Sequence, residues 1–255
     1  MNTAKQPAAQ EPVVQRVRIR YTKRGPLRFT SHRDFARALE RAMRRASIPV
    51  AYSAGFSPHP KISYQSAAPT GVASECEYAE ISLRREMEPE EFARRLDEAL
   101  PPGIDILAAV TAHEPGFADR IEASRWRIEI SHTDPNTVSD AVVRFLAETE
   151  VIVSRLTKKG NRSFDARSAV VRAEVTPVAG ADDGTCAILE IVVRQVTPAV
   201  RPDDVLSGLS LVADLELQAP PRVTRLAQGL LTESGEITDP LDADRKRRVL
   251  DSASC

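Results

Sequence analysis

Apolar and basic side chains alternate along residues 15–21. The apolar members are Val17, Ile19 and Tyr21, and the basic members are Arg16, Arg18 and Arg20. A period of two residues is typical of a half-buried strand, because successive side chains point to opposite faces. The pattern predicts a strand whose exposed face is a ladder of arginines.

The period becomes that of a helix over residues 31–47. Ser31 and Asp34 have the spacing of an N-terminal capping pair, and Pro49 ends the helix. The predicted buried stripe consists of Phe35, Leu39, Ala42, Met43 and Ala46. The outer face carries Arg33, Arg37, Arg41 and Arg44, with Glu40 as the one nearby acid that could pair within it. Because like charges at this spacing repel one another, the row favours an anionic partner.

The rest of the chain repeats these two periods. Expected strands are residues 77–83, 104–110, 126–130, 151–156, 170–178 and 187–196, with further strand in 211–231; expected helices are residues 88–100, 133–150 and a short one from residue 202. Pro89 and Pro202 each open a helix and precede two acids and an apolar residue. This echo predicts an α+β fold of tandem ferredoxin-like (βαββαβ) units with antiparallel sheets.

The predicted organisation has five parts. They are a disordered lead-in (1–14), a first unit with the basic helix and a Pro-His-Pro loop (15–110), a link (111–124), a second unit (125–231) and a disordered tail (232–255). No apolar run reaches membrane-spanning length, and the N-terminus lacks an apolar signal core. The three cysteines are far apart, which suits a reducing compartment. We expect a cytoplasmic protein without a membrane segment.

The loop within residues 52–80 is unusual in composition. Pro58 and Pro60 bracket His59, and Lys61 follows. Each proline fixes its own φ and favours an extended residue before it, so His59 lies in a stiff frame. Tyr52, Phe56 and Tyr64 lie close by in the sequence. Two interpretations stand: a wide hairpin connection whose aromatics cap the core, or a rigid loop that presents His59, Lys61 and an aromatic face to a ligand.

Charge is concentrated near the N-terminus. The chain has 35 Lys and Arg against 36 Asp and Glu, yet residues 16–61 carry a net +10 and the remainder −11. A basic region on an otherwise acidic protein suggests an anionic partner. The alternative is a helix with solvated arginines.

The sequence contains none of the common motifs for nucleotide or zinc binding. The sequence has no P-loop, no dinucleotide-binding glycine fingerprint and no zinc-ligand spacing, so we expect no metal and no cofactor. His32 and His59 are candidate acid–base residues, because RNA cleavage by 2′-OH attack needs a base, an acid and nearby cations. More often such histidines bind a phosphate or the loop backbone.

The candidate RNA-binding residues are basic side chains and these two histidines. They are Arg18, Arg20, Arg28, His32, Arg33, Arg37, Arg41, Arg44, His59, Lys61, Lys158 and Lys159. In RNA-binding domains bases stack on aromatics while Arg and Lys hold phosphates. For most of the tyrosines and phenylalanines near the loop, a place in the core is the favoured alternative.

Four segments carry a family resemblance: residues 29–34 (FTSHRD), 55–63 (GFSPHPKIS), 69–71 (PTG) and 75–78 (ECEY). They resemble the radical-SAM-linked bacterial proteins of unknown function, over residues 17–231, and residues 155–160 and 224–225 fit the same pattern. In that family the domain is fused to a radical SAM enzyme or encoded beside it, and a ribonuclease of the E/G type is a frequent neighbour. The resemblance implies an RNA-related role. This chain lacks the three-cysteine cluster motif and is not itself the radical SAM enzyme.

The leading hypothesis is a non-catalytic RNA-binding module for structured RNA such as tRNA or rRNA, acting with a radical SAM RNA-modification enzyme. The segment GFSPHP and the doubled fold are also similar, more loosely, to CRISPR repeat-processing endoribonucleases. One alternative is therefore a metal-independent endoribonuclease that uses His32 and His59. The other is a protein-binding adaptor without RNA affinity.

Overall fold

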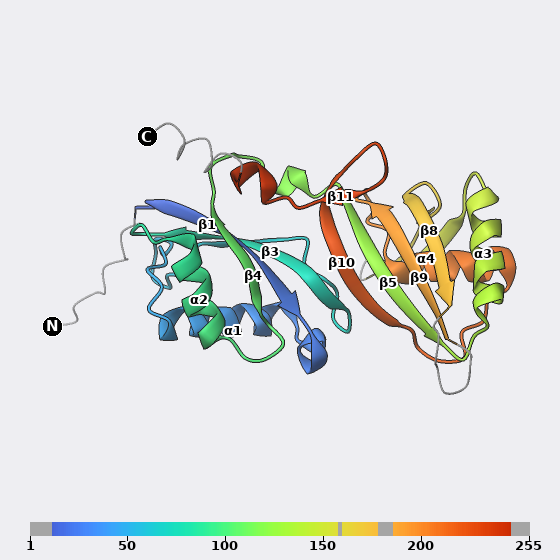
Figure 1. The fold of residues 1–255 in the computed structure, drawn as a ribbon, viewed down its shortest axis with the longest axis horizontal. Coiled ribbons are helices and arrows are strands. Elements are labelled where there is room, and N and C mark those ends of the chain that lie inside the picture. The colour runs from blue at the N-terminus through green and yellow to red at the C-terminus, as the bar shows by residue number, and fades with distance from the viewer. Residues whose placement is uncertain (1–11, 158–159, 178–185, 246–255) are drawn as a thin grey trace. The chain divides into compact units, whose positions relative to one another are not determined.

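The computed structural model describes residues 12–157, 160–177 and 186–245 (Figure 1). The chain divides into two compact units. The first contains the described residues up to 118 together with 241–245, and the second contains residues 119–240. Each unit is an α+β structure with an antiparallel sheet.

The first unit holds four strands and two α-helices. In chain order they are β1 (Gln15–Lys23), the 3₁₀ turn η1 (Gly25–Phe29), α1 (His32–Arg45), β2 (Ile62–Gln65), β3 (Ala73–Leu83), α2 (Pro89–Ala99) and β4 (Ile106–Thr111). β1 pairs with both β3 and β4, and β2 pairs with the same β3 residues that face β1, from the opposite edge. The order across the sheet is therefore β4–β1–β3–β2.

One face of this sheet packs against both helices (Figure 1). Val17 and Ile19 of β1 meet Phe35 and Leu39 of α1 in one buried cluster. Phe92 and Leu96 of α2, together with Ala79, Ile81 and Leu83 of β3, complete it. The helical and strand periods read from the sequence place these residues on matching faces, because each buries only one side.

The helix ends are fixed by local chemistry. The Ser31 hydroxyl oxygen accepts a hydrogen bond from the Asp34 backbone N–H at 3.2 Å, and the same hydroxyl donates to the Asp34 carboxylate at 2.7 Å. An N-cap of this kind satisfies one of the free N–H groups of the first turn. Helix α2 instead begins at Pro89, whose missing N–H is not needed at that position.

The second unit contains one more hairpin than the first. Its elements are η2 (Ala118–Arg120, which begins one residue before the unit), β5 (Ala123–Ser131), α3 (Pro135–Ala147), β6 (Ile152–Thr157), β7 (Gly160–Asp165), β8 (Val170–Pro177), β9 (Cys186–Arg194), α4 (Pro202–Ala213), β10 (Arg222–Leu231) and β11 (Ile237–Thr238). β5 lies between β10 and β9, and β8 pairs with β9. The order across the sheet is therefore β10–β5–β9–β8. It matches the order in the first unit if β5, β8, β9 and β10 are equated with β1, β2, β3 and β4.

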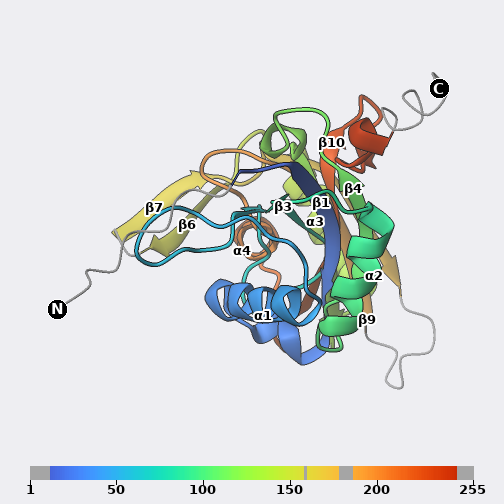
Figure 2. The ribbon, with the colours of Figure 1, turned by 90° about the vertical axis from the view of Figure 1, so that its left-hand side faces the viewer.

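The additional hairpin is β6–β7, a two-stranded sheet of its own (Figure 2). Strand β7 was not predicted, because its sequence GNRSFD is polar and only Phe164 is buried. Its strand character comes from pairing with β6, which no local period encodes. Lys158 and Lys159, two of the candidate RNA-binding residues, lie outside the described residues.

The predicted disordered tail is wrong for residues 232–245. β11 pairs with the end of β10, and residues 242–245 form a helical turn. Asp244 is 1% exposed and Leu241 is fully buried, so both polar and apolar buried contacts hold this segment. Residues 1–11 of the predicted lead-in and residues 246–255 of the tail lie outside the described residues.

Candidate nucleic-acid interface

Helix α1 presents a row of exposed guanidinium groups. Phe35, Leu39, Ala42 and Met43 are buried on its inner face. Arg33, Arg37, Arg41 and Arg44 are exposed on the outer face, as the sequence predicts. Arg37 lies 3.9 Å from the Asp34 carboxylate, and both side chains are more than half exposed. Such an exposed pair contributes little, so the row keeps most of its positive charge.

Glu40, expected as the acid of this row, faces a different neighbour. Its charge acts on Tyr64 of β2, whose pKa is raised mainly by burial and further by Glu40. The Tyr64 hydroxyl is buried and has no hydrogen-bond partner. The acid that pairs within the row is Asp34, one turn before Arg37.

The prediction that the arginines of β1 form an exposed ladder is wrong for Arg18, which is buried, and Arg20 is only partly exposed. Arg18 is 3% exposed, and its guanidinium donates to Glu80 (2.8 Å), Asp244 (2.7 Å) and the Glu114 carbonyl (2.7 Å). It also lies 4.6 Å from the centre of the Phe117 ring. Arg20 is half-buried and donates to the Glu75 carbonyl. Only Arg16 among the three is exposed.

Arg18 and Arg20 lie on the face of the sheet opposite to α1, so they do not form one surface with the arginine row of that helix. Val17, Ile19 and Tyr21 face the helices, so the alternating Arg18 and Arg20 point to the opposite face of the sheet. The segments that cover Arg18, residues 114–117 and 244, were missed by sequence reasoning. No local signal could have found them, because they pair over 96 and 226 positions of sequence.

The Pro-His-Pro loop forms an irregular hairpin, which we call the Phe56 hairpin (residues 51–61). Lys61 N–H donates to the Ala51 carbonyl, and Tyr52 and Pro60 are bridge partners. His59 is exposed, and its backbone accepts from Ser53 N–H at 2.9 Å and donates to the Ser53 hydroxyl at 3.0 Å. Lys61 is half-buried. The hairpin is therefore closed at its base, as the two prolines suggest.

The aromatic side chains near the loop divide into two kinds. Tyr21 is buried and stacks on Phe35 at 4.9 Å between ring centres, and Tyr64 packs edge-on against Phe35. These belong to the core, as the favoured alternative had it. Phe56, in contrast, is 76% exposed.

His32 and Arg28 lie at the N-terminal end of α1. His32 is exposed, and its ring meets Tyr64 edge-to-face at 4.8 Å. Arg28 is half-buried and stacks on the exposed Phe29 ring at 4.7 Å, while its Nε is buried without a partner. Arg28 thus precedes the helix that carries the arginine row, and His32 is its first residue.

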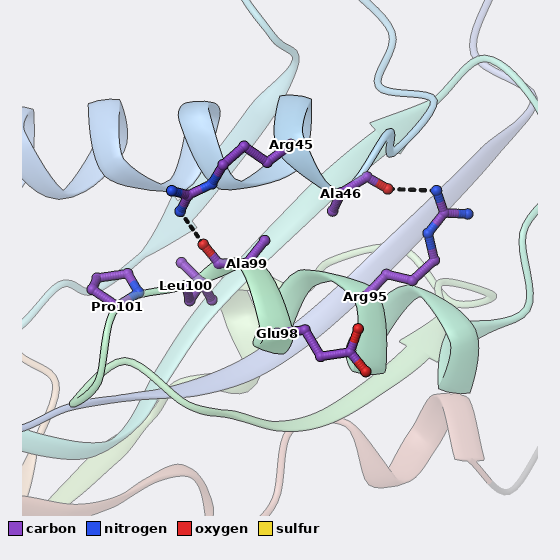
Figure 3. A pocket seen from close by; sticks show the side chains of 7 residues that line it. All are labelled: Arg45, Ala46, Arg95, Glu98, Ala99, Leu100 and Pro101. Atoms are coloured by element: carbon purple, nitrogen blue, oxygen red, sulfur yellow. Dashed lines mark hydrogen bonds between the residues drawn. The ribbon is translucent and has the colours of Figure 1, made fainter.

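The C-terminal ends of α1 and α2 are joined by a reciprocal pair of arginine contacts (Figure 3). Arg45 of α1 donates to the Ala99 carbonyl of α2, and Arg95 of α2 donates to the Ala46 carbonyl at the end of α1. A pocket of about 670 Å³ lies between them. Because cations satisfy the last carbonyls of a helix, these two arginines have a structural role and are not free for a phosphate.

Within residues 12–157, 160–177 and 186–245, no group of three or more His, Cys, Asp or Glu side chains is placed to hold a metal ion. In the same part of the chain, no helix is long and apolar enough to cross a membrane.

Residues 16–202 match the family described as an uncharacterised protein conserved in bacteria, DUF2344. The chain belongs to this family. No curated protein matches the sequence. A solved Cbf5–Nop10–Gar1 complex contains a chain that is similar with a TM-score of 0.42 and 12% identity, over 83% of this chain and 48% of that one. This DUF2344 chain thus spans about half the length of that neighbour, and a likeness at this level carries no argument about function.

Proposed function

We propose that this protein is a non-catalytic RNA-binding module that acts on structured RNA such as tRNA or rRNA, together with a radical SAM RNA-modification enzyme. The observation that carries the proposal is the exposed row on α1: Arg33, Arg37, Arg41 and Arg44. The other predicted basic groups on β1 are engaged within the first unit, so α1 supplies the cationic surface.

The geometry of the row suits a polyanion. At about 1.5 Å rise per residue, its four guanidiniums extend over roughly 16 Å of helix. Arginines at i and i+4 repel one another, and the single pair to Asp34 is long and exposed. An RNA backbone that neutralises several of these charges removes the repulsion and releases counterions. His59, exposed on the stiff Phe56 hairpin, is a further hydrogen-bonding group for this RNA.

The fold proposal is that both units are ferredoxin-like. Two facts support it: the order β4–β1–β3–β2 in the first unit and the corresponding order β10–β5–β9–β8 in the second. Each order arises from two split β-α-β crossovers with antiparallel neighbours. In the second unit, β6–β7 is an insertion between α3 and β8.

The proposed partner rests on the sequence motifs FTSHRD and GFSPHPKIS. They resemble a family whose members accompany a radical SAM enzyme, and an E/G-type ribonuclease is a second candidate partner. Because the chain's three cysteines lack cluster spacing, it would present RNA to an enzyme that holds the cluster itself. Such a partnership belongs in the cytoplasm.

The proposal is tested by the salt dependence of RNA binding. The variant Arg37→Ala/Arg41→Ala should weaken binding of all RNA sequences alike and flatten the slope of log K against log salt by about one to two units. A charge-matched control is Arg94→Ala/Arg222→Ala, which removes two arginines whose side chains are 60% and 65% exposed elsewhere. The control should leave the slope unchanged. The measurement is fluorescence anisotropy with labelled tRNA at several salt concentrations.

Three other outcomes would contradict the proposal in different ways. A folded Arg37→Ala/Arg41→Ala protein with unchanged affinity and slope would remove α1 from the binding surface. Absence of RNA affinity in the wild type at low salt would favour the protein-binding adaptor. Discrete RNA cleavage in EDTA that disappears in His59→Ala would favour the endoribonuclease.

A further inference from the structure

The tip of the Phe56 hairpin exposes an aromatic ring that the core does not use. Phe56 is 76% exposed, more than Phe29 at 60%. Gly55, with φ of 117°, turns the chain just before the ring, and a Cβ built there would meet no atom within 4 Å. A Phe side chain usually stabilises a protein by being buried, and Phe56 makes no such contribution. The ring is therefore available to a ligand.

The hairpin holds this ring at low entropic cost. Its base is locked by the hydrogen bonds between Ser53 and His59 and by the bridge between Tyr52 and Pro60. Pro58 and Pro60 fix their own φ angles. A preorganised aromatic side chain loses little conformational freedom when it binds, which favours a contact role.

The sequence that contains the hairpin is basic, which favours an anionic ligand. Between Glu40 and Glu75 the sequence has no acidic residue, and it contains Arg41, Arg44 and Lys61, besides Arg45, which is bonded to the Ala99 carbonyl. An exposed aromatic ring can accept a base on its face while phosphates of the same strand contact cationic groups. Aromatic stacking in RNA recognition uses bases that are not already stacked in a duplex.

We infer that Phe56 stacks on an unpaired base of the bound RNA, so that the substrate class is RNA with a single-stranded loop, bulge or end. This inference rests on the proposed function and deepens it. The exposed ring stacks on the base, the α1 row holds the flanking backbone, and fully paired RNA gains nothing from Phe56.

The inference is tested with the 255-residue chain and two labelled RNAs, a single strand and the same strand in a blunt duplex. Phe56→Ala should weaken single-strand binding by about tenfold or more and leave duplex binding unchanged. Phe56→Trp should keep wild-type affinity, because its ring also stacks. Since Phe56 touches no phosphate, the salt slope should be the same in all three proteins. Leu211→Ala, at a 63% exposed position on α4, is the matched control and should bind as the wild type does.

The results separate this inference from the proposed function. If Phe56→Ala binds the single strand as tightly as the wild type, or loses duplex affinity equally, the stacking role is wrong while RNA binding stands. If the wild type binds neither RNA at low salt, the proposed function fails, and the stacking role fails with it. Circular dichroism of each variant establishes that it is folded; Phe56→Trp keeps an aromatic ring at this position should Phe56→Ala not fold.

Discussion

Arg18 Nη1 donates a hydrogen bond to Asp244 Oδ2 at 2.7 Å and joins the first strand to a segment 226 positions later. Both side chains are almost fully buried, at 4% and 0% exposure. The second carboxylate oxygen of Asp244 accepts from the backbone N–H groups of His113 and Glu114 at 2.9 and 3.1 Å. The pair thus fastens residues 113–114 and 241–245 to β1.

We predict that Asp244→Ala strongly destabilises the protein. The substitution leaves the Arg18 guanidinium without one of its two carboxylates and leaves two backbone N–H groups without their acceptor. Breaking a buried pair by removing one partner costs about 3–5 kcal/mol in the free energy of unfolding. Urea denaturation followed by circular dichroism measures this change.

The control lies in the same helical turn. Asp242 pairs with Arg245 at 2.7 Å, but its side chain is 47% exposed. Asp242→Ala should therefore change the unfolding free energy by less than about 0.5 kcal/mol. Equal stabilities for the two variants would show that the buried pair does not hold the C-terminal segment.

The second prediction concerns the unpartnered hydroxyl of Tyr64. Because that hydroxyl makes no hydrogen bond, Tyr64→Phe removes a buried polar group at no loss of a contact and should stabilise the protein by about 1 kcal/mol at neutral pH. A fall in stability would show that the hydroxyl is bonded after all.

Alkaline pH provides an independent check on Tyr64. Burial first, and Glu40 second, raise the pKa of Tyr64 above its usual value near 10. A raised pKa in the folded state means that unfolding is favoured once the pH exceeds the unfolded value. The stability advantage of Tyr64→Phe over the wild type should therefore grow as the pH rises above about 10, measured by urea midpoints across that range.

The third prediction concerns the contact of α4 with α3. A Cβ at Gly208 would lie 2.7 Å from Phe145 Cε2 and 3.3 Å from Val151 Cγ1. The Phe145 ring is fully buried and cannot move aside without loss of packing. Although Ala has the better helix propensity, Gly208→Ala should lower the free energy of unfolding by about 1–2 kcal/mol.

Ser210, exposed on the same helix, gives the comparison. Ser210→Ala should be neutral or slightly stabilising, within about 0.5 kcal/mol, because it only replaces an exposed hydroxyl by hydrogen and Ala has the higher helix propensity. Thermal unfolding of both variants decides the point: a Gly208→Ala protein that is more stable than wild type would mean that propensity outweighs crowding there.

Local sequence patterns were sufficient to predict helix α1, its start and its two faces. The 3.6-residue period located α1 and its two faces, the Ser31–Asp34 pair located its start, and the exposure of Arg33, Arg37, Arg41 and Arg44 followed. The reason is that a helix forms all its backbone hydrogen bonds within one segment, so its faces are encoded by neighbours in sequence. The α+β class with antiparallel sheets followed from the same reasoning.

Tertiary structure decided what lies over the second face of each strand. The alternation in β1 showed that Arg18 lies on the opposite face of the strand from Val17 and Ile19. That Arg18 is buried depends on Asp244 and Phe117, which pack over that face from distant parts of the chain. Strand β7, polar along most of its length, exists because β6 pairs with it. In the same way, the helical turn at residues 242–245 is held by Arg18, which lies 226 positions before Asp244, whereas β11 pairs locally with the end of β10. Period-two patterns distinguish two faces of a strand without saying which is solvated, because the covering groups come from elsewhere in the chain.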